Sequence, residues 1–257
     1  MSEEPITQSS LEEIASWLRA AGRVVALTGA GVSTESGIPD FRGPQGVWTK
    51  NPRAERLSSL QHYLADKELR IEAWRARLAH PAWAATPNAG HRALAELERK
   101  GKLTTLVTQN IDGLHQLAGT SAGAIIEIHG TMREVVCMDC GERADMNRAL
   151  DRVRTGEEDP DCRTCGGILK SATISFGQSL IAEDLERARI AAESCDVFIA
   201  AGTSLTVYPV AHLPNAALSA GARLVILNNE PTPYDRLADA VVNEPLAKVL
   251  PRLAALA

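Results

Sequence analysis

Short apolar runs that alternate with helical patterns constrain the fold of this chain more than any other feature. Five of the runs end in glycine or polar residues, and these ends are Gly29-Ala30-Gly31, Gln109-Asn110, His129, Gly202-Thr203-Ser204 and Asn228. The alternation predicts an α/β fold built on a doubly wound parallel, Rossmann-like sheet. Because the carboxyl ends of parallel strands line the ligand crevice of such a sheet, the five ends predict a single binding site.

The first of these ends predicts a turn that binds a dinucleotide. Residues 23–27 have the pattern of a buried parallel strand, and Gly29 and Gly31 follow it directly. Gly29 permits a tight turn, and Gly31 lets backbone N–H groups approach a pyrophosphate closely. The motif is incomplete, because Thr34 replaces the third glycine and no acidic residue follows at a strand end about twenty residues later.

The chain after this turn is expected to leave the sheet without forming an ordinary crossover helix. Pro39 is excluded from a helix interior, and it biases Ile38 away from helical angles. Residues 37–42 then form either a surface loop with a hydrophobic anchor or a cover over the reactive end of a bound cofactor. The polarity of the loop and its place beside a phosphate-binding turn favour the cover.

Two Cys-x-x-Cys pairs predict a zinc site. The pairs are Cys137 with Cys140 and Cys162 with Cys165, and a glycine follows each pair. Four thiolates in a tetrahedral array suit zinc and leave no position open for water, so we expect a structural ion. Unrelated buried thiols and a redox pair do not account for the matched spacing, and the acidic residues around the pairs argue against a nucleic-acid-binding ribbon. The fifth cysteine, Cys195, is expected to be a small buried apolar residue.

The composition argues against several classes of protein. The net charge is −5 and aromatic residues make up 4% of the chain, which together make nucleic-acid binding unlikely. No apolar run is long enough to span a membrane, so no membrane partner is expected. The first residues lack the basic and apolar regions of a signal peptide, and a cytoplasmic location is therefore expected. The oligomeric state stays open.

His129 is the only one of the six histidines that directly follows a predicted strand beside a glycine. A histidine titrates near neutral pH and is therefore suited to general-base catalysis. A structural hydrogen bond is the alternative role, but the neighbouring strand end with Asn110 and Asp112 favours catalysis. His115 is expected to be a structural helix residue, and no constellation is visible around the remaining four, which are His62, His80, His91 and His212.

The first turn and its continuation resemble the signature of a known family. Residues 29–33, Gly-Ala-Gly-Val-Ser, and residues 36–42, Ser-Gly-Ile-Pro-Asp-Phe-Arg, are similar to the signature of the bacterial-type sirtuins, which are NAD-dependent protein-lysine deacylases. Ile128-His129-Gly130 matches a second motif, and the resemblance extends from about Val24 to about Val242. It implies that NAD is consumed as a co-substrate, that each chain holds one structural zinc, and that acyl-lysine proteins bind as an extended peptide.

The implied reaction is deacylation, with an acetyl group as the first expectation. The amide oxygen of the acyl-lysine attacks the nicotinamide ribose, nicotinamide leaves, and a general base then activates a ribose hydroxyl. The products are nicotinamide, free lysine and O-acyl-ADP-ribose. Transfer of ADP-ribose to a protein side chain would begin with the same bond cleavage, and a non-enzymatic NAD sensor or a zinc-ribbon binding module is a third class.

The resemblance also implies roles for the residues that match the family's motifs. The pyrophosphate and the adjoining ribose would contact Gly29, Ala30, Gly31, Ser33, Gly202, Thr203 and Ser204. The nicotinamide carboxamide would occupy a pocket made by Ala30, Ile38, Phe41, Asn110, Ile111 and Asp112, and Arg42 would support the loop that covers it. Asn110 and Asp112 would count with His129 as catalytic residues. Gln109 and His129 would contact the nicotinamide ribose, Asn228 would contact the adenosine ribose, and the peptide would lie between Phe176-Gly177 and Thr206-Val207 as an added strand.

Two insertions are expected to build a second, smaller module. The NAD-binding domain is predicted to comprise residues 1–42, 91–132 and 172–257. The small domain is predicted to combine a helical module, residues 43–90, with the four-cysteine zinc ribbon, residues 133–171. NAD is expected in the cleft between the two, and a strand around residues 173–176 is expected to return the chain to the main body.

The chain departs from the family pattern at two places. Ser171-Ala172 and Gln178 replace the Pro-Asp and the Glu that many sirtuins carry near the peptide-binding edge, so details of substrate clamping are expected to differ. Sirtuins that prefer acidic acyl groups carry Tyr-x-x-Arg in the helical module. Here Trp74 stands three residues before Arg77, so a hydroxyl partner for an acyl carboxylate is expected to be missing.

Overall fold

A six-stranded parallel sheet forms the larger part of the molecule. The computed structural model describes residues 8–41, 46 and 58–257. The strand order is β3-β2-β1-β7-β8-β9, and every neighbouring pair is parallel. The strands are β1 (Val24–Thr28), β2 (Leu103–Thr108), β3 (Ile125–Glu127), β7 (Val197–Ala201), β8 (Arg223–Leu227) and β9 (Ala240–Val242). The chain winds outward from β1 in both directions, which confirms the doubly wound sheet.

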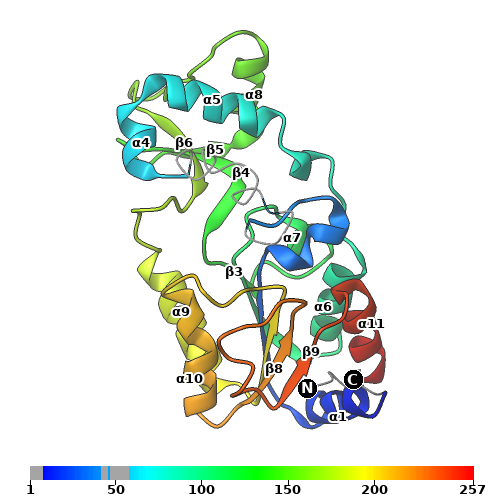
Figure 1. Cartoon of the computed structure of the whole chain (residues 1–257). Coiled ribbons are helices and arrows are strands. Elements are labelled where there is room, and N and C mark those ends of the chain that lie inside the picture. The colour runs from blue at the N-terminus through cyan, green and yellow to red at the C-terminus, as the bar shows by residue number, and fades with distance from the viewer. Residues whose placement is uncertain (1–7, 42–45, 47–57) are drawn as a thin grey trace.

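Helices cover both faces of this sheet (Figure 1). One face carries α1 (Gln8–Ala20), α6 (Ala89–Arg99) and α11 (Leu246–Leu256), and the other carries α9 (Ala182–Ser194) and α10 (Leu213–Ser219). Successive side chains of β1 alternate between the two cores. Val24 and Ala26 belong to the first, and Val25 and Leu27 to the second. A strand buried on both faces must be apolar throughout, which is why its sequence pattern was continuous.

The second part of the molecule joins two segments that are far apart in the sequence (Figure 1). Its antiparallel sheet has the order β5-β4-β6, with β4 (Gly130–Cys137), β5 (Arg143–Asp145) and β6 (Leu169–Thr173). The helices are α4 (Leu60–Ala65), α5 (Lys67–Leu78) and α8 (Met146–Arg154). Trp74 of α5 is fully buried in one core with Val135, Met146 and Leu150 from the cysteine segment. The exact domain boundaries given above stay a prediction.

The strand expected around residues 173–176 in the main body is wrong. The strand is β6, it ends at Thr173, and it pairs with β4 in the small sheet. It was missed because Lys170 and Ser171 do not look like buried strand residues. The Lys170 side chain is nevertheless buried, since its ammonium donates to the carbonyl oxygens of Ser171 and Thr173.

Short elements connect the sheets to the edge that holds the predicted site. They are the 3-10 turns η1 (Ala30–Val32), η2 (Thr34–Ser36), η3 (Pro81–Trp83) and η4 (Val210–His212), and the helix α7 (Leu114–Leu117). The two 3-10 turns after β1 confirm that no ordinary crossover helix follows the first glycines. Asn88 caps α6 as expected, because its Oδ1 accepts from the backbone of Gly90 and His91. Within the described part of the chain, no helix combines the length and the apolar character needed to cross a membrane.

Candidate cofactor and substrate site

Three glycines bring the ends of β1 and β7 into direct contact. The Gly31 N–H donates to the Gly202 carbonyl oxygen at 2.9 Å, and the Gly29 N–H donates to the Ala201 carbonyl oxygen at 3.1 Å. A Cβ atom on Gly29 would lie 2.7 Å from the Gly202 oxygen, and one on Gly31 would lie 2.7 Å from the Gly202 Cα. Gly202 itself has a φ of 63°. The glycines are therefore required first for this backbone contact, and the Gly31 N–H faces Gly202.

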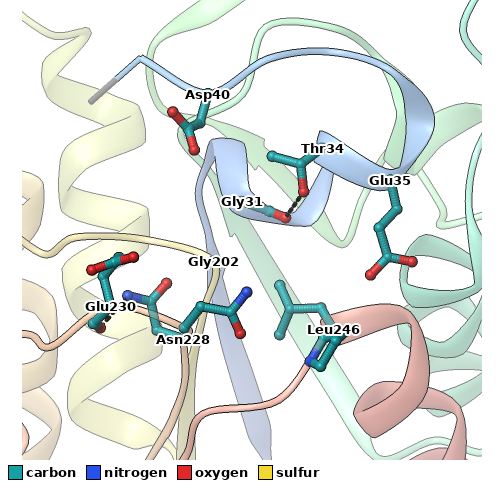
Figure 2. A pocket seen from close by; sticks show the side chains of 10 residues that line it. Gly31, Thr34, Glu35, Asp40, Gly202, Asn228, Glu230 and Leu246 are labelled. Atoms are coloured by element: carbon teal, nitrogen blue, oxygen red, sulfur yellow. Dashed lines mark hydrogen bonds between the residues drawn. The ribbon is translucent and has the colours of Figure 1, made fainter. Parts of the chain in front are cut away.

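A cavity of about 210 Å³ opens beside Gly31 and Gly202 (Figure 2). Its walls come from the turns after β1, β7 and β8 and from the start of α11, and its lining is Gly31, Thr34, Glu35, Asp40, Gly202, Asn228, Asn229, Glu230, Pro245 and Leu246. Asn228, predicted to contact the adenosine ribose, lines this cavity, and its Nδ2 donates to the Glu230 carbonyl oxygen. Three carboxylates face this cavity, so an anionic group in it must be held by neutral donors or by a cation from outside this lining. Arg42, which was expected to support the loop over the carboxamide pocket, lies outside the described residues.

A buried polar network occupies the end of β2. The Asn110 Nδ2 donates to the Gly29 carbonyl oxygen and to the Ser33 Oγ, each at 3.1 Å. The Ser33 hydroxyl donates to the Asp112 Oδ2 at 2.7 Å, and the Leu114 N–H donates to the Asp112 Oδ1 at 2.9 Å. Asn110, Asp112 and Ser33 are all buried. The structure thus brings the two predicted carboxamide-pocket residues together, and it places the Ser33 side chain with them.

Two buried histidines, His91 and His115, lie next to this network, and the sequence analysis predicted no role for His91. The His91 Nε2 lies 3.4 Å from the Ser33 Oγ, and the His115 Nε2 lies 3.0 Å from the Thr28 Oγ1. Their rings are 4.8 Å apart between centroids. Burial lowers the pKa of His91 to about 4, partly opposed by Asp112, while burial and the neighbouring His91 lower the pKa of His115 to about 3. Both rings are therefore neutral near pH 7. The prediction that His115 is a helix residue is confirmed. The prediction that His91 has no functional neighbours is wrong, and the available signal was its position three residues after the cap residue Asn88.

His129 lies two residues after the last residue of β3, at the same edge of the sheet. Its Nδ1 lies 3.1 Å from the Gln109 carbonyl oxygen. A carbonyl oxygen only accepts, so this contact fixes the proton on Nδ1 and leaves Nε2 as the nitrogen that takes up a proton. The imidazole is thereby oriented by the strand end that also carries Asn110.

The side chains of Gln109 and Thr203 connect the chain after β2 to the chain after β7. The Gln109 Nε2 donates to the Thr203 Oγ1 at 2.8 Å. The next residue, Ser204, is bonded to the Thr206 hydroxyl at 2.8 Å, and the backbone at Leu205 has the unusual φ of 53°. The loop after β7 therefore presents hydroxyl groups at the edge where the cavity opens.

The residues assigned to a peptide lie on two separate segments. The Phe176 N–H donates to the Ser58 carbonyl oxygen at 2.8 Å, and its own carbonyl accepts from the Leu60 N–H at 3.0 Å, so part of this edge is already paired. Gly177 follows with a φ of 83°. Val207 lies in the loop after β7, where its carbonyl accepts from the Ala211 N–H. Phe41, expected at the carboxamide pocket, is 39% exposed.

The four paired cysteines form one cluster. Their Sγ atoms all lie within 4.8 Å of one another, and the nearest pairs are Cys137 with Cys165 at 3.5 Å and Cys140 with Cys162 at 3.8 Å. Gly141 and Gly166 have φ values of 76° and 74°, as tight turns after the two pairs require. Four sulfur ligands at these separations fit a tetrahedral zinc ion. Cys195 lies apart from them, buried against the main sheet as expected.

Comparisons with known proteins agree with this geometry. The model of the Sir2 family matches residues 29–209. A protein of Streptomyces coelicolor called NAD-dependent protein deacetylase 2 is 51% identical over 90% of this chain and 95% of its own length, and one of Bradyrhizobium diazoefficiens called NAD-dependent protein deacetylase 1 is 42% identical over 95% and 94%. A solved structure described as Sir2-p53 peptide-NAD+ superposes with a TM-score of 0.85 at 32% identity, covering 95% of this chain and 97% of the other.

Proposed function

The chain belongs to the Sir2 family and is an NAD-dependent protein deacetylase, and we propose that it works through His129 as its general base. The observation that supports this role most directly is the Nδ1 contact of His129 with the Gln109 carbonyl oxygen at 3.1 Å. NAD, when bound, supplies the ADP-ribosyl group that takes up the acyl group, with nicotinamide as the leaving group. The Nε2 of His129 accepts a proton from a ribose hydroxyl. The Nδ1 keeps its own proton, which is hydrogen-bonded to the Gln109 carbonyl oxygen.

Asn110 and Asp112 are proposed to form the pocket for the leaving nicotinamide. The amino group of the carboxamide needs acceptors, and the Asn110 Oδ1 and the Asp112 carboxylate are acceptors, whereas both Asn110 N–H bonds already donate to Gly29 and Ser33. Ser33, which hydrogen-bonds to both side chains, keeps them in one arrangement before the cofactor arrives. Preorganised polar groups in a water-poor site promote the departure of the leaving group more than mobile ones.

The remaining cofactor groups are proposed to lie along the same edge. The main chain at the ends of β1 and β7 is packed together, and Gly31 and Gly202 line the cavity beside it, so a pyrophosphate in the cavity would lie next to this main chain. Thr203 and Ser204 offer hydroxyl groups to it. Asn228 and Glu230 line the cavity and suit the hydroxyl groups of the adenosine ribose. The chemistry of the lining therefore fits NAD.

The acyl-lysine peptide is proposed to bind between Gly177 and Val207. Gly177 lies in the loop after β6, which begins beside His129 because the Ile174 N–H donates to the His129 carbonyl oxygen, and Val207 lies in the loop after β7. A peptide between the two loops would add backbone hydrogen bonds on both sides. The Phe176 backbone is already paired with residues 58 and 60, and the Gln178 N–H donates to the Ser175 carbonyl oxygen, so the proposed contact on this edge is Gly177. The zinc cluster is proposed to be structural, with four cysteine ligands that leave no coordination position for chemistry.

One assay tests this function against its alternatives. The protein is incubated with NAD and an acetyl-lysine peptide, and nicotinamide, free lysine and protein-bound label are measured. Nicotinamide release that depends on the peptide and matches the lysine formed supports the deacetylase. Label on protein would instead indicate ADP-ribosyl transfer, and the absence of NAD turnover would overturn the proposal. A parallel panel of longer and acidic acyl groups defines the acyl range.

A further inference from the structure

Arg133 connects three segments of the chain at the back of the carboxamide pocket. It lies on β4, four residues after His129, and its Nε and Nη2 both donate to the Asp112 carbonyl oxygen, at 2.9 and 2.7 Å. The Nη2 also lies 3.4 Å from the Ala82 carbonyl oxygen. The guanidinium carbon sits 5.0 Å from the centre of the Trp83 ring. One side chain of the small antiparallel sheet thus contacts both the pocket loop, which is the segment of residues 111–113 after β2, and the 3-10 turn η3.

The pocket loop is shaped to receive this guanidinium. Gly113, directly after Asp112, has a φ of 74°, and a Cβ atom there would lie 3.0 Å from the Arg133 Nε. The neighbouring Met132 N–H donates to the Ile111 carbonyl oxygen at 2.9 Å, so two successive residues of β4 hold the loop. On the opposite side, Ser33 and Leu114 hold the two oxygens of the Asp112 carboxylate. Asp112 is therefore fixed at its main chain by Arg133 and at its side chain by Ser33 and Leu114.

The other partners of Arg133 are themselves anchored. The Trp83 Nε1 donates to the Arg77 carbonyl oxygen at 2.7 Å, which ties the aromatic platform to the end of α5. Ala82 is fully buried. A lysine in place of Arg133 would keep the charge, but it lacks the planar fork that spans the Asp112 carbonyl and the face of Trp83 together.

We propose that Arg133 is a positioning residue for nicotinamide cleavage. It does not touch the substrate. It holds the loop that carries Asp112, so that the Asp112 carboxylate keeps its position beside Asn110, and it connects this loop to Ala82 and Trp83 of the helical module. This inference rests on the proposed place of Asp112 in the leaving-group pocket. Because small displacements of a positioned group cost large factors in rate, the loss of Arg133 is expected to slow nicotinamide cleavage about tenfold or more.

The test compares Arg133→Ala, Arg133→Lys and a matched control, Arg143→Ala, at equal fractions of folded protein. Arg143 belongs to the same small sheet but pairs with Glu134 on the surface. For Arg133→Ala we expect exchange of labelled nicotinamide into NAD to fall about tenfold and inhibition by nicotinamide to weaken by a similar factor, with the KM for the peptide nearly unchanged. Arg133→Lys should lie between Arg133→Ala and the wild type, and Arg143→Ala should match the wild type. A purely structural role would lower thermal stability without separating nicotinamide exchange from peptide binding.

The same measurements in an Asp112→Asn background identify the route of the effect. If Arg133 acts through Asp112, the two losses are not additive, and Arg133→Ala changes little in that background. Wild-type exchange in folded Arg133→Ala, or equal losses in both backgrounds, would overturn the inference. If Arg133→Ala does not fold, Arg133→Lys is judged by the same criteria. Wild-type exchange in Asp112→Asn alone would instead remove Asp112 from the leaving-group pocket and leave the deacetylase itself intact.

Discussion

The site depends on single side chains whose orientation is fixed by main-chain carbonyl oxygens. The Gln109 carbonyl orients His129, and the Gly29 carbonyl orients Asn110. A carbonyl oxygen accepts hydrogen bonds without titrating, so these orientations persist across the working pH range. The consequence at this scale is that neither His129 nor Asn110 loses an ionised partner in these two contacts when it is replaced.

His129→Ala is expected to fold normally and to bind NAD, while deacetylation falls by roughly a hundredfold or more, the usual scale for loss of acid–base catalysis. Nicotinamide exchange is expected to survive better than product formation, because the first bond cleavage does not require the base. Both rates are measured by product chromatography at matched thermal stability.

The control for this change is His62→Ala, which alters an exposed histidine of α4. It should leave both rates at the wild-type level. Near-normal deacetylation in the folded His129→Ala protein would remove His129 from the mechanism.

At the scale of elements, the strand ends are held by backbone contacts that leave no space for a side chain. Gly202 shows this most clearly, since a Cβ there would lie 2.5 Å from the Val32 nitrogen and 2.7 Å from the Gly31 carbonyl carbon. Both obstructing atoms belong to main chain, which cannot rotate away as a side chain would. The contact between the ends of β1 and β7 therefore requires glycine at position 202.

Gly202→Ala is therefore expected to lower the free energy of unfolding by about 3 kcal/mol or more, through left-handed strain and overpacking together. Gly101→Ala is the matched control. Gly101 has a similar φ of 71° but no atom within 4 Å of a Cβ, so its replacement should cost only about 1 kcal/mol. Urea titration measures both, and equal costs would show that strain alone determines the effect.

The zinc cluster makes a second prediction at this scale. Purified protein is expected to contain one zinc per chain, and Cys137→Ser should abolish it, whereas Cys195→Ser should leave it unchanged. Since metal binding supplies folding energy to a small module, chelation should increase hydrogen exchange in β4, β5 and α8 and abolish activity indirectly. Mass spectrometry of the intact protein and of its exchanged peptides would report both. Full activity after complete removal of zinc would contradict a structural role.

Across the whole molecule, the main sheet could be predicted from the sequence and the small sheet could not. The bounds of β7 follow directly from an apolar run, because a strand buried on both faces leaves a continuous local pattern. The bounds of β2 follow from its β-branched residues, although Thr104 is exposed. β6 contains the buried Lys170, and its assignment depends on pairing with β4, which no local pattern reports. The same reason explains the site. The strand ends and the cysteines carry their own signal, whereas His91 and Arg133 act only through contacts with segments distant in the sequence.

A prediction for the whole molecule follows from the two neutral histidines. The pKa values of His91 and His115 in the folded protein, about 4 and about 3, lie below the ordinary value of 6.5. The unfolded chain therefore binds more protons than the folded one below pH 6.5, and stability contributed by these groups is lost as the pH falls from 6.5 toward about 4. Each group contributes a slope of at most about 1.4 kcal/mol per pH unit.

His91→Gln removes one of these groups, so its free energy of unfolding should fall less steeply with acidification than that of the wild type. His62→Gln, at the exposed site, should leave the slope unchanged. Urea titrations between pH 7.5 and pH 5 give the slopes, and equal slopes in the wild type and His91→Gln would refute the assignment.

The contact between Gly31 and Gly202 also sets an order in time. Ribosomes release a chain from its N-terminus, so β1 and its glycine turn emerge well before β7 exists. Until β7 has emerged, the Gly31 N–H has no Gly202 carbonyl to meet, and one wall of the cavity is absent. A nascent chain can bind zinc once Cys165 has emerged, but it has no place for NAD. The enzyme therefore acquires its cofactor site late in its own synthesis, when β7 from the last third of the chain pairs with β1 from the first third.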